Sequence, residues 1–182
     1  MQTNQTYVGA FVSQFARPNM ARILKNAGLD YFILDCEHGM LSMENVEDVI
    51  SVANAVGILP FVRIPLISRQ WVGQALDAGA AGLVVPYIRC AQEVRELVRL
   101  AKYPPLGCRG VALQRGNTGF QPVESTKVYA EWANENLMIF PQIETLEAVE
   151  AMDEIAGVPG VAGLFLGAVD LSVLYGYQDP VA

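Results

Sequence analysis

The chain has 182 residues, of which 52% are hydrophobic and only 17% are charged. This composition excludes an intrinsically disordered chain and indicates a globular domain with a core layer buried on both sides. Lys and Arg number 12 against 19 Asp and Glu, so the net charge is −7, which argues against a nucleic acid or an anionic membrane as the main partner. We expect one domain over residues 1–182, in which any anionic ligand needs a local basic site.

Targeting and redox signals are weak. The longest uncharged apolar run, residues 157–169, contains Pro159 and several glycines and is too short to span a bilayer. The first residues lack the basic start and apolar segment of a signal peptide. Cys36, Cys90 and Cys108 are an odd count without CxxC spacing. We therefore expect no transmembrane helix and a reducing cytoplasm in which all three thiols are free.

A short apolar run, a turn, a helical pattern and another turn recur along the chain, which is typical of βα units around a parallel sheet. Apolar runs without polar alternation predict strands that are covered on both faces. The expected strands are Tyr7–Val12, Tyr31–Leu34, Leu59–Val62, Gly82–Val85, a weak one near Gly110–Leu113, Leu137–Pro141 and Gly163–Leu166. Apolar residues between the strands repeat with the helical period.

Turn and cap residues mark the expected ends of the helices. Three residues that can accept hydrogen bonds from first-turn amides predict helix starts at Ser42, Ser68 and Thr145. Three glycines suit left-handed helix ends, at Gly28, Gly57 and Gly79. The stretch from Tyr103 to Pro122 is rich in Gly and Pro and is expected to be a long loop, a kind of segment that is commonly functional.

Seven expected strands leave two architectures, an open doubly wound α/β sheet or a (β/α)8 TIM barrel. No GxGxxG follows the first strand and no GxxxxGK[ST] occurs, so the open sheet lacks its usual nucleotide-binding marker and the barrel is favoured. Both architectures place the chemistry at the carboxyl ends of the strands. The polar residues at those ends are therefore the candidate site.

The first such cluster follows the strand that ends at Leu34. Asp35, Glu37 and His38 bring together three ionisable groups, including the single histidine of the chain. One histidine excludes a His-rich zinc site, so any metal must be held by oxygen. The alternative is a cluster that caps a helix or satisfies a loop. Arg63 ends the next strand, where it either pairs with a neighbouring carboxylate or binds an anionic substrate bidentately.

Two carboxylates follow later strands. Glu144 and Asp170 lie 26 residues apart, about one βα unit, which predicts that they lie side by side at the mouth of the barrel. Adjacent carboxylates repel unless they share a proton or a cation, so the pair predicts Mg²⁺ or Mn²⁺. Because helices follow both residues, each is alternatively a capping or first-turn acid. No lysine stands at a strand's carboxyl end, which argues against Schiff-base chemistry.

Five segments occur in order: Leu34–Gly39 (LDCEHG), Val62–Pro65 (VRIP), Tyr103–Gly110 (YPPLGCRG), Gln142–Glu144 (QIE) and Gly167–Ser172 (GAVDLS). Together they resemble the HpcH/HpaI family of class II, divalent-metal-dependent 2-oxo acid aldolases. The resemblance implies a TIM barrel of the phosphoenolpyruvate/pyruvate type that forms a cytoplasmic homo-oligomer, a trimer or hexamer. The implied reaction is reversible retro-aldol cleavage of 4-hydroxy-2-oxo acids to pyruvate, or a related 2-oxo acid, and an aldehyde.

The resemblance also implies residue roles. Glu144 and Asp170 would ligate the cation, with Co²⁺ as a further option beside Mg²⁺ and Mn²⁺. Arg63 would stabilise the enolate, and His38 would act as the base with Asp35 beside it. The residues expected to contact the substrate are Gln142, Gly167, Val169, Asp170 and Ser172.

Two features depart from the family pattern. Ala168 and Val169 stand where the family usually has Pro-Ala, so the loop loses proline's fixed φ and gains a β-branched residue. The chain is also shorter than the roughly 250 residues of a full barrel, so we expect a C-terminally truncated barrel with about seven strands. Two rival functions are a catalytically silent chain that acts through association and a citrate lyase β-like enzyme acting on acyl-CoA esters.

Overall fold

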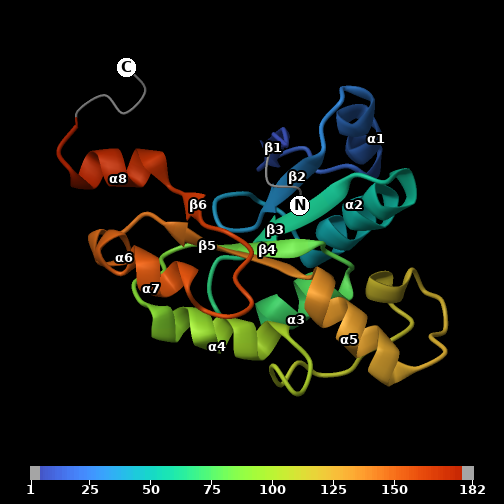
Figure 1. Cartoon of the computed structure of the whole chain (residues 1–182). Helices are drawn as coiled ribbons and strands as arrows, with labels where there is room; N and C mark the ends of the chain where they lie inside the picture. Colours follow the sequence, from blue (N-terminus) through green and yellow to red (C-terminus); the bar gives the residue numbers. More distant parts are fainter. Residues whose placement is uncertain (1–4, 178–182) are drawn as a thin grey trace.

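A computed structural model describes residues 5–177 and shows a six-stranded parallel sheet (Figure 1). The strands lie in chain order, and each pairs in parallel with the next. They are β1 (Gly9–Val12), β2 (Tyr31–Asp35), β3 (Leu59–Arg63), β4 (Gly82–Val85), β5 (Met138–Ile143) and β6 (Phe165–Leu166). This order places every strand's carboxyl end at the same edge of the sheet.

Helices connect the strands on the outer side of the sheet (Figure 1). They are α1 (Pro18–Asn26), α2 (Met43–Val56), α3 (Arg69–Asp77), α4 (Ala91–Ala101), α5 (Thr126–Asn136), α6 (Leu146–Glu150) and α7 (Met152–Ala156), with a 3₁₀ turn, η1 (Gly116–Thr118). A further helix, α8 (Ala168–Leu174), follows β6, the last strand of the described residues. Over residues 5–177 no helix is long and apolar enough to cross a membrane.

The sheet is curled. Phe11 of β1 and Phe165 of β6 belong to the two ends of the strand order, yet their rings meet edge to face with centroids 5.6 Å apart. A flat sheet would hold the first and sixth strands more than 20 Å apart, since neighbouring strands are about 4.8 Å apart. The fold is therefore an α/β fold with a concave, inward-facing side.

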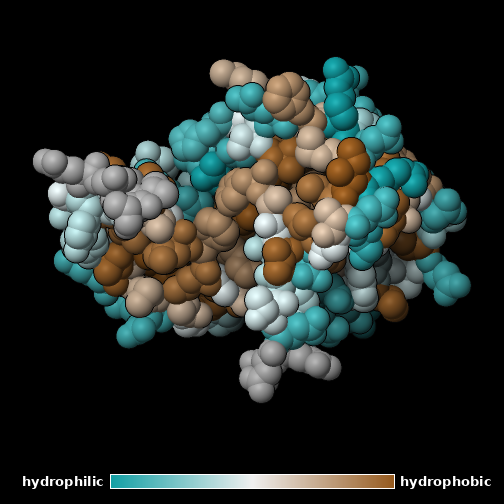
Figure 2. Space-filling model, turned by 90° about the horizontal axis from the view of Figure 1, so that it is seen from above, coloured by the Kyte–Doolittle hydropathy of each residue, from teal (hydrophilic) through white to brown (hydrophobic). Residues whose placement is uncertain are grey.

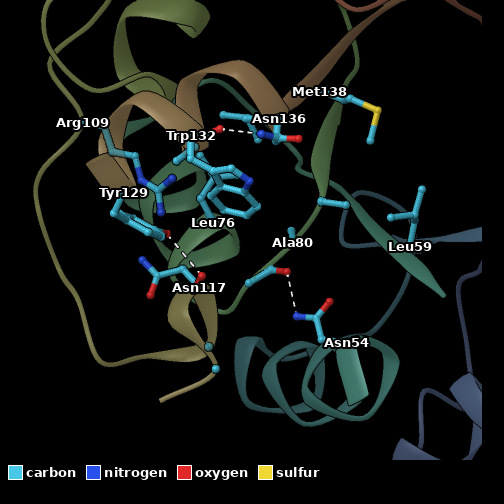
Figure 3. Close-up of a pocket in the computed structure, with 16 residues that line it drawn as sticks. Asn54, Leu59, Leu76, Ala80, Arg109, Asn117, Tyr129, Trp132, Asn136 and Met138 are labelled. Atoms are coloured by element: carbon cyan, nitrogen blue, oxygen red, sulfur yellow. Dashed lines mark hydrogen bonds between the residues drawn. The ribbon is translucent and has the colours of Figure 1, made fainter. Parts of the chain in front are cut away.

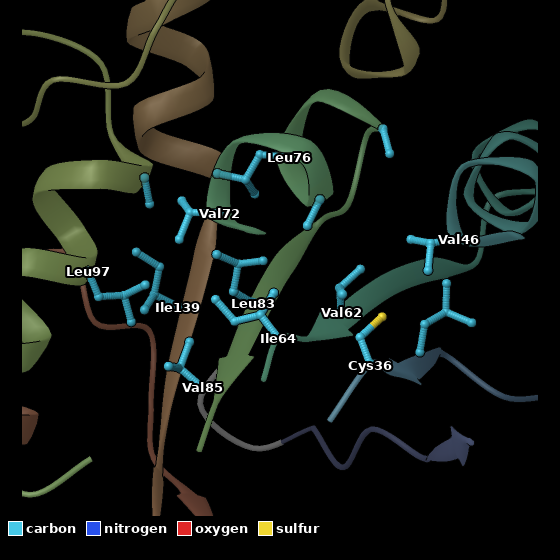
Figure 4. Packing of buried hydrophobic residues seen from close by; sticks show 14 of the residues in the cluster. Cys36, Val46, Val62, Ile64, Val72, Leu76, Leu83, Val85, Leu97 and Ile139 are labelled. Atoms are coloured by element: carbon cyan, nitrogen blue, oxygen red, sulfur yellow. The ribbon is translucent and has the colours of Figure 1, made fainter. Parts of the chain in front are cut away.

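The main core lies between the convex side of the sheet and the helices (Figure 4). Alternate strand residues such as Val62, Leu83 and Ile139 are fully buried against the apolar stripes of the helices, for example Val72 of α3 and Leu97 of α4. Removing such side chains from water is the main stabilising contribution to folding. This layer fixes the positions of the strands whose ends carry the polar residues.

A second, smaller apolar cluster lies on the concave side, centred on Ile33, Phe61 and Val84. Side chains alternate between the two faces of a strand, so the residue two positions after Ile33, Asp35, and the residue two positions after Phe61, Arg63, face the same side. The concave side thus has an apolar floor with a charged layer above it at the carboxyl ends.

The predicted caps are confirmed. The hydroxyls of Ser42, Ser68 and Thr145 accept hydrogen bonds from first-turn amides of α2, α3 and α6. Gly57, which ends α2, is left-handed with φ 71°, where a side chain would be strained. Gly28 and Gly79 also have positive φ, and the three cysteines are free.

The prediction of a strand near Gly110–Leu113 was wrong. These residues form part of an unpaired loop, because β4 pairs directly with β5 and leaves no place between them. The described residues therefore hold six strands rather than seven. The short apolar run Val111–Leu113 belongs instead to the long predicted loop, whose only regular element is η1.

Candidate active site

Asp35 and Arg63 form the centre of the charged layer. They are the last residues of β2 and β3 and stand opposite each other in the sheet register. Arg63 Nε donates to Asp35 Oδ1 at 2.8 Å, and Nη2 donates to Oδ2 at 2.7 Å. The Ser13 hydroxyl donates to Asp35 Oδ2 at 3.0 Å. Such a bidentate pair between buried groups fixes the plane of the guanidinium.

Glu37 provides a second carboxylate beside Arg63, and no role was predicted for it. Its Oε2 lies 3.1 Å from Arg63 Nη1, although not in hydrogen-bond geometry, and its side chain is 9% exposed. Its position in the LDCEHG segment was the only sequence signal. The Arg63 guanidinium therefore lies between two carboxylates, above the Phe11 ring at 4.9 Å.

The two carboxylates have opposite pKa shifts. Burial raises the pKa of Asp35, but the hydrogen bonds and charge of Arg63, with hydrogen bonds from the His38 main chain and Ser13, together hold the pKa below its usual range. Burial also raises the pKa of Glu37, and there the charges of Arg63 and His38 offset it only in part, so that pKa lies above its usual range. Glu144 and Asp35 contribute to this rise, which indicates that the charges of these five acidic and basic groups influence one another.

His38 lies at the rim of the site. Its side chain is 70% exposed, and Nε2 is 3.8 Å from Glu37 Oε2. Asp35 contacts the main chain of His38, whose N–H donates to Oδ1 at 3.3 Å, while the imidazole turns toward Glu37. The structure thus brings His38 beside Asp35, with Glu37 as the carboxylate nearest its ring.

Glu144 and Gln142 extend the layer along β5. Glu144 is 5% exposed, and its Oε1 accepts the Tyr87 main-chain N–H at 2.6 Å. Its Oε2 accepts a hydrogen bond from Gln142 Nε2. Gln142 Oε1 is buried and has no hydrogen-bond partner. Tyr87 was not predicted, although its place two residues after β4 and its positive φ of 54° mark it as a strand-exit residue held in a strained conformation.

The loop from β6 into α8 packs directly on Glu144. A Cβ at Gly167 would lie 2.5 Å from Glu144 Cβ and 2.9 Å from its Oε2, so only glycine allows this approach. The Gly167 N–H donates to the Ile143 carbonyl at 2.9 Å, which leaves it unavailable to a substrate. Val169 and Asp170 are exposed. The Ser172 hydroxyl donates to the Ala168 carbonyl within α8.

The donor set suits a hard divalent cation. Over residues 5–177 no three Asp, Glu, His or Cys side chains gather as a ligand cluster. Mg²⁺ in proteins typically takes only one or two carboxylates and completes its shell with water and substrate oxygens. Glu144, the exposed carboxylate of Asp170 and the unpartnered amide oxygen of Gln142 are oxygen donors of this kind.

A cavity of about 370 Å³ opens at this edge of the sheet, lined among others by Ser13, Arg63, Gln142, Gly167 and Asp170. A separate cavity of about 450 Å³ lies at the opposite, amino-terminal ends of β3 to β5 (Figure 3). Its single charged lining residue, Arg109, is paired with Asp77 at 2.9 Å. Five predicted site residues line the first cavity, namely Arg63, Gln142, Gly167, Val169 and Asp170. Its lining does not include Asp35, His38, Glu144 or Ser172.

Fold and site together define an α/β protein with a curled parallel sheet and a charged site at the strands' carboxyl ends. The chain belongs to the HpcH/HpaI aldolase/citrate lyase family, whose model matches residues 8–181. It is 35% identical over 166 residues to a hydroxypyruvate/pyruvate aldolase of Roseovarius nubinhibens, covering 90% of this chain and 63% of that relative.

Two further relatives agree. A 4-hydroxy-2-oxo-heptane-1,7-dioate aldolase of Escherichia coli is 36% identical over 164 residues, which is 86% of this chain and 59% of the relative. The crystal structure of an HpcH/HpaI aldolase from Desulfitobacterium hafniense DCB-2 superposes with a TM-score of 0.91 at 40% identity, covering 95% of this chain and 66% of that one. The chain thus spans about 60 to 66% of the length of these relatives.

Proposed function

We propose that the chain carries the site of a divalent-metal-dependent aldolase. Such a lyase reversibly cleaves a 4-hydroxy-2-oxo acid to pyruvate, or a related 2-oxo acid, and an aldehyde. The observation that carries the proposal is the Arg63 guanidinium held by Asp35 and Glu37 in the same layer as Gln142 and Glu144. The aldolase names of the matched relatives support it.

Glu144 and Asp170 are the residues that would hold the cation, which we take to be Mg²⁺, Mn²⁺ or Co²⁺. When bound, the cation supplies a Lewis acid that stabilises negative charge on the oxygens of the 2-oxo acid. The unpartnered Gln142 Oε1 and the Gly167 turn lie against Glu144 and shape the same region.

Arg63 stabilises the negative charge that develops on the former keto oxygen as the carbon–carbon bond breaks. Asp35 and Glu37 hold the guanidinium in place before the substrate arrives, so little reorganisation is needed in the transition state. His38, exposed at the rim, takes the proton of the 4-hydroxyl, because imidazole is the side chain that most often serves as a general base. Val169 and Ser172, on α8, complete the substrate pocket.

The test is addition of pyruvate to a short aldehyde with Mn²⁺ or Mg²⁺, followed by detection of the adduct. Activity should disappear with a chelator and return with metal. Glu144→Gln should abolish metal dependence, whereas Arg63→Ala should lower turnover by about 100-fold or more with little change in metal affinity. Unchanged kinetics in both variants would contradict the assigned roles.

We further propose a (β/α)8 barrel and a cytoplasmic homo-oligomer. The curl of the sheet supports the barrel, because Phe11 and Phe165 already meet across it. Apolar side chains also gather on the face shown in Figure 2, and Val173, Leu174 and Tyr175 are each more than half exposed. Light scattering after size exclusion measures the assembly directly.

A further inference from the structure

The cavity at the carboxyl ends of the strands has two unlike parts. Arg63, Gln142 and Asp170 form a polar part. Phe11, Phe165 and Val169 form an apolar part. The apolar part is held in place by specific contacts. The Phe11 and Phe165 rings pack edge to face with centroids 5.6 Å apart, and Phe11 also lies under the Arg63 guanidinium.

In the proposed function the polar part is used by the 2-oxo acid. Its carboxylate and keto oxygens need the cation and Arg63, which leaves the apolar wall for the other substrate, the aldehyde. Val169 stands at this wall in the first turn of α8 with 55% of its surface exposed. A hydrocarbon tail that covers Phe11 and Val169 removes apolar surface from water on both sides.

Charge limits the aldehyde further. Arg63 is the only cation among the residues that line this cavity, and in the proposed function it serves the keto oxygen of the 2-oxo acid. Its Nη1 lies 3.1 Å from Glu37. A carboxylate on the aldehyde's tail would therefore find no free cation among the residues that line this cavity. A charged tail that covers Phe11 and Val169 would also lose hydration against an apolar surface.

We propose that the aldehyde substrate is short, neutral and apolar, and that this wall, with Val169 as its exposed member, selects against aldehydes bearing a second carboxylate. The inference rests on the proposed aldolase function and adds the class of the second substrate. In the addition direction, the pyruvate methyl carbon loses a proton and bonds to the aldehyde carbon, whose oxygen gains a proton. No oxidant or reductant is required.

The experiment compares butanal with succinic semialdehyde, two four-carbon aldehydes that differ by a methyl in place of a carboxylate. With pyruvate and Mn²⁺, kcat/KM for butanal should exceed that for succinic semialdehyde by about tenfold or more. Equal values, or a preference for succinic semialdehyde, would overturn the inference.

A variant pair tests the wall itself. Val169→Arg places a cation at the wall and should shift the ratio toward succinic semialdehyde by about tenfold. Val128→Arg is the matched control, since Val128 lies in the first turn of α5, is 63% exposed and does not line the cavity. The control should keep the wild-type ratio. An unchanged ratio in a folded Val169→Arg protein would exclude the assigned role of the wall.

Exchange of the pyruvate methyl protons in D2O separates the two levels of the proposal, because enolisation needs Mn²⁺ and the polar part but no aldehyde. Exchange with adduct formation but without preference for butanal overturns the inference and leaves the proposed function standing. Exchange without any adduct contradicts the aldolase activity and the inference with it. If neither exchange nor adduct is detected, the proposed function and the inference are both contradicted. Exchange with the expected preference supports both.

Discussion

The exits of β2 and β3 and the exit of β6 contribute to one site but are built differently. Asp35 and Arg63 end central strands with a partner on each side, and both side chains are largely buried. Asp170 follows a two-residue strand whose one partner among residues 5–177 is β5, and its side chain is exposed on the seven-residue helix α8. One half of the site is thus preformed by the sheet, whereas the other depends on a lightly held loop.

This difference teaches how the functional roles divide. The buried half positions a guanidinium whose charge is balanced by two carboxylates, so its geometry persists without a ligand. The carboxylate of the exposed half remains hydrated until a cation binds, so there is no desolvation cost in the absence of the cation. We expect substitutions in the buried half to affect stability and those in the exposed half to affect binding.

The largest expected effect is on stability. Asp35→Asn leaves Arg63 without its bidentate partner and should lower the free energy of unfolding by about 3 to 5 kcal/mol. Urea denaturation measures this loss. Asp30→Asn is the control, because its carboxylate also accepts a main-chain N–H, that of Val8, but contacts no cation, so its loss should stay near 1 kcal/mol. Similar losses in both variants would contradict the importance of the pair.

The pH dependence of this loss follows from the lowered pKa of Asp35. A lowered folded-state pKa contributes stability above the unfolded value, about 3.9, and the contribution disappears as pH falls through the folded value. The gap between wild type and Asp35→Asn should therefore be constant from pH 8 to about 5 and shrink below about pH 4. Glu37 acts oppositely: its raised pKa gives stability below about 4.3 that is lost as pH rises through the folded value.

In the exposed half, Asp170→Asn should leave the free energy of unfolding within about 0.5 kcal/mol of wild type. Affinity for Mn²⁺ should fall by at least about 10- to 100-fold, as measured by calorimetric titration. Asp153→Asn, an exposed acid in the first turn of α7, is the control and should bind Mn²⁺ normally. Equal affinities in the two variants would exclude Asp170 as a ligand.

The contact between the two halves is tested at Gly167. Gly167→Ala forces a Cβ to 2.5 Å from Glu144 Cβ, and the resulting shift should cost about 1 to 3 kcal/mol of stability and weaken Mn²⁺ binding. Gly73→Ala, in α3 with nothing within 4 Å of the position of an added Cβ, should instead stabilise the protein by about 0.5 to 1 kcal/mol. Thermal melts with and without Mn²⁺ compare them; the prediction fails if both variants melt alike.

The smallest effect is on thiol reactivity. Cys36 follows Asp35 in the buried half, where burial and then the charge of Asp35 raise its pKa to about 11. Cys90 and Cys108 are exposed. Since the thiolate is the nucleophile, iodoacetamide at pH 8 should add two groups to the native protein and three in urea, as counted by mass spectrometry. Rapid triple labelling of native protein would show that the buried half opens.

Sequence reasoning predicted most of the fold because its signals were local. Apolar runs marked β2 to β5 closely, and Ser42 and Gly57 marked both ends of α2. The run near Gly110–Leu113 misled, since three apolar residues do not distinguish a strand from a loop and only β4–β5 pairing excludes the strand. Glu37 and Tyr87 had no predicted role because their contacts with Arg63 and Glu144 join residues far apart in the chain.

The sequence by itself determined the βα rhythm, the caps and the residues that stand at the carboxyl ends of the strands. These follow from periodicity and side-chain chemistry, which act over a few residues. Only the tertiary structure decided which of those residues meet. The curl that brings Phe11 to Phe165, the register that sets Asp35 against Arg63 and the turn that presses Gly167 onto Glu144 all depend on strand pairing and packing between distant segments. Local sequence patterns do not specify such contacts, because many pairings satisfy the same pattern of apolar and polar residues.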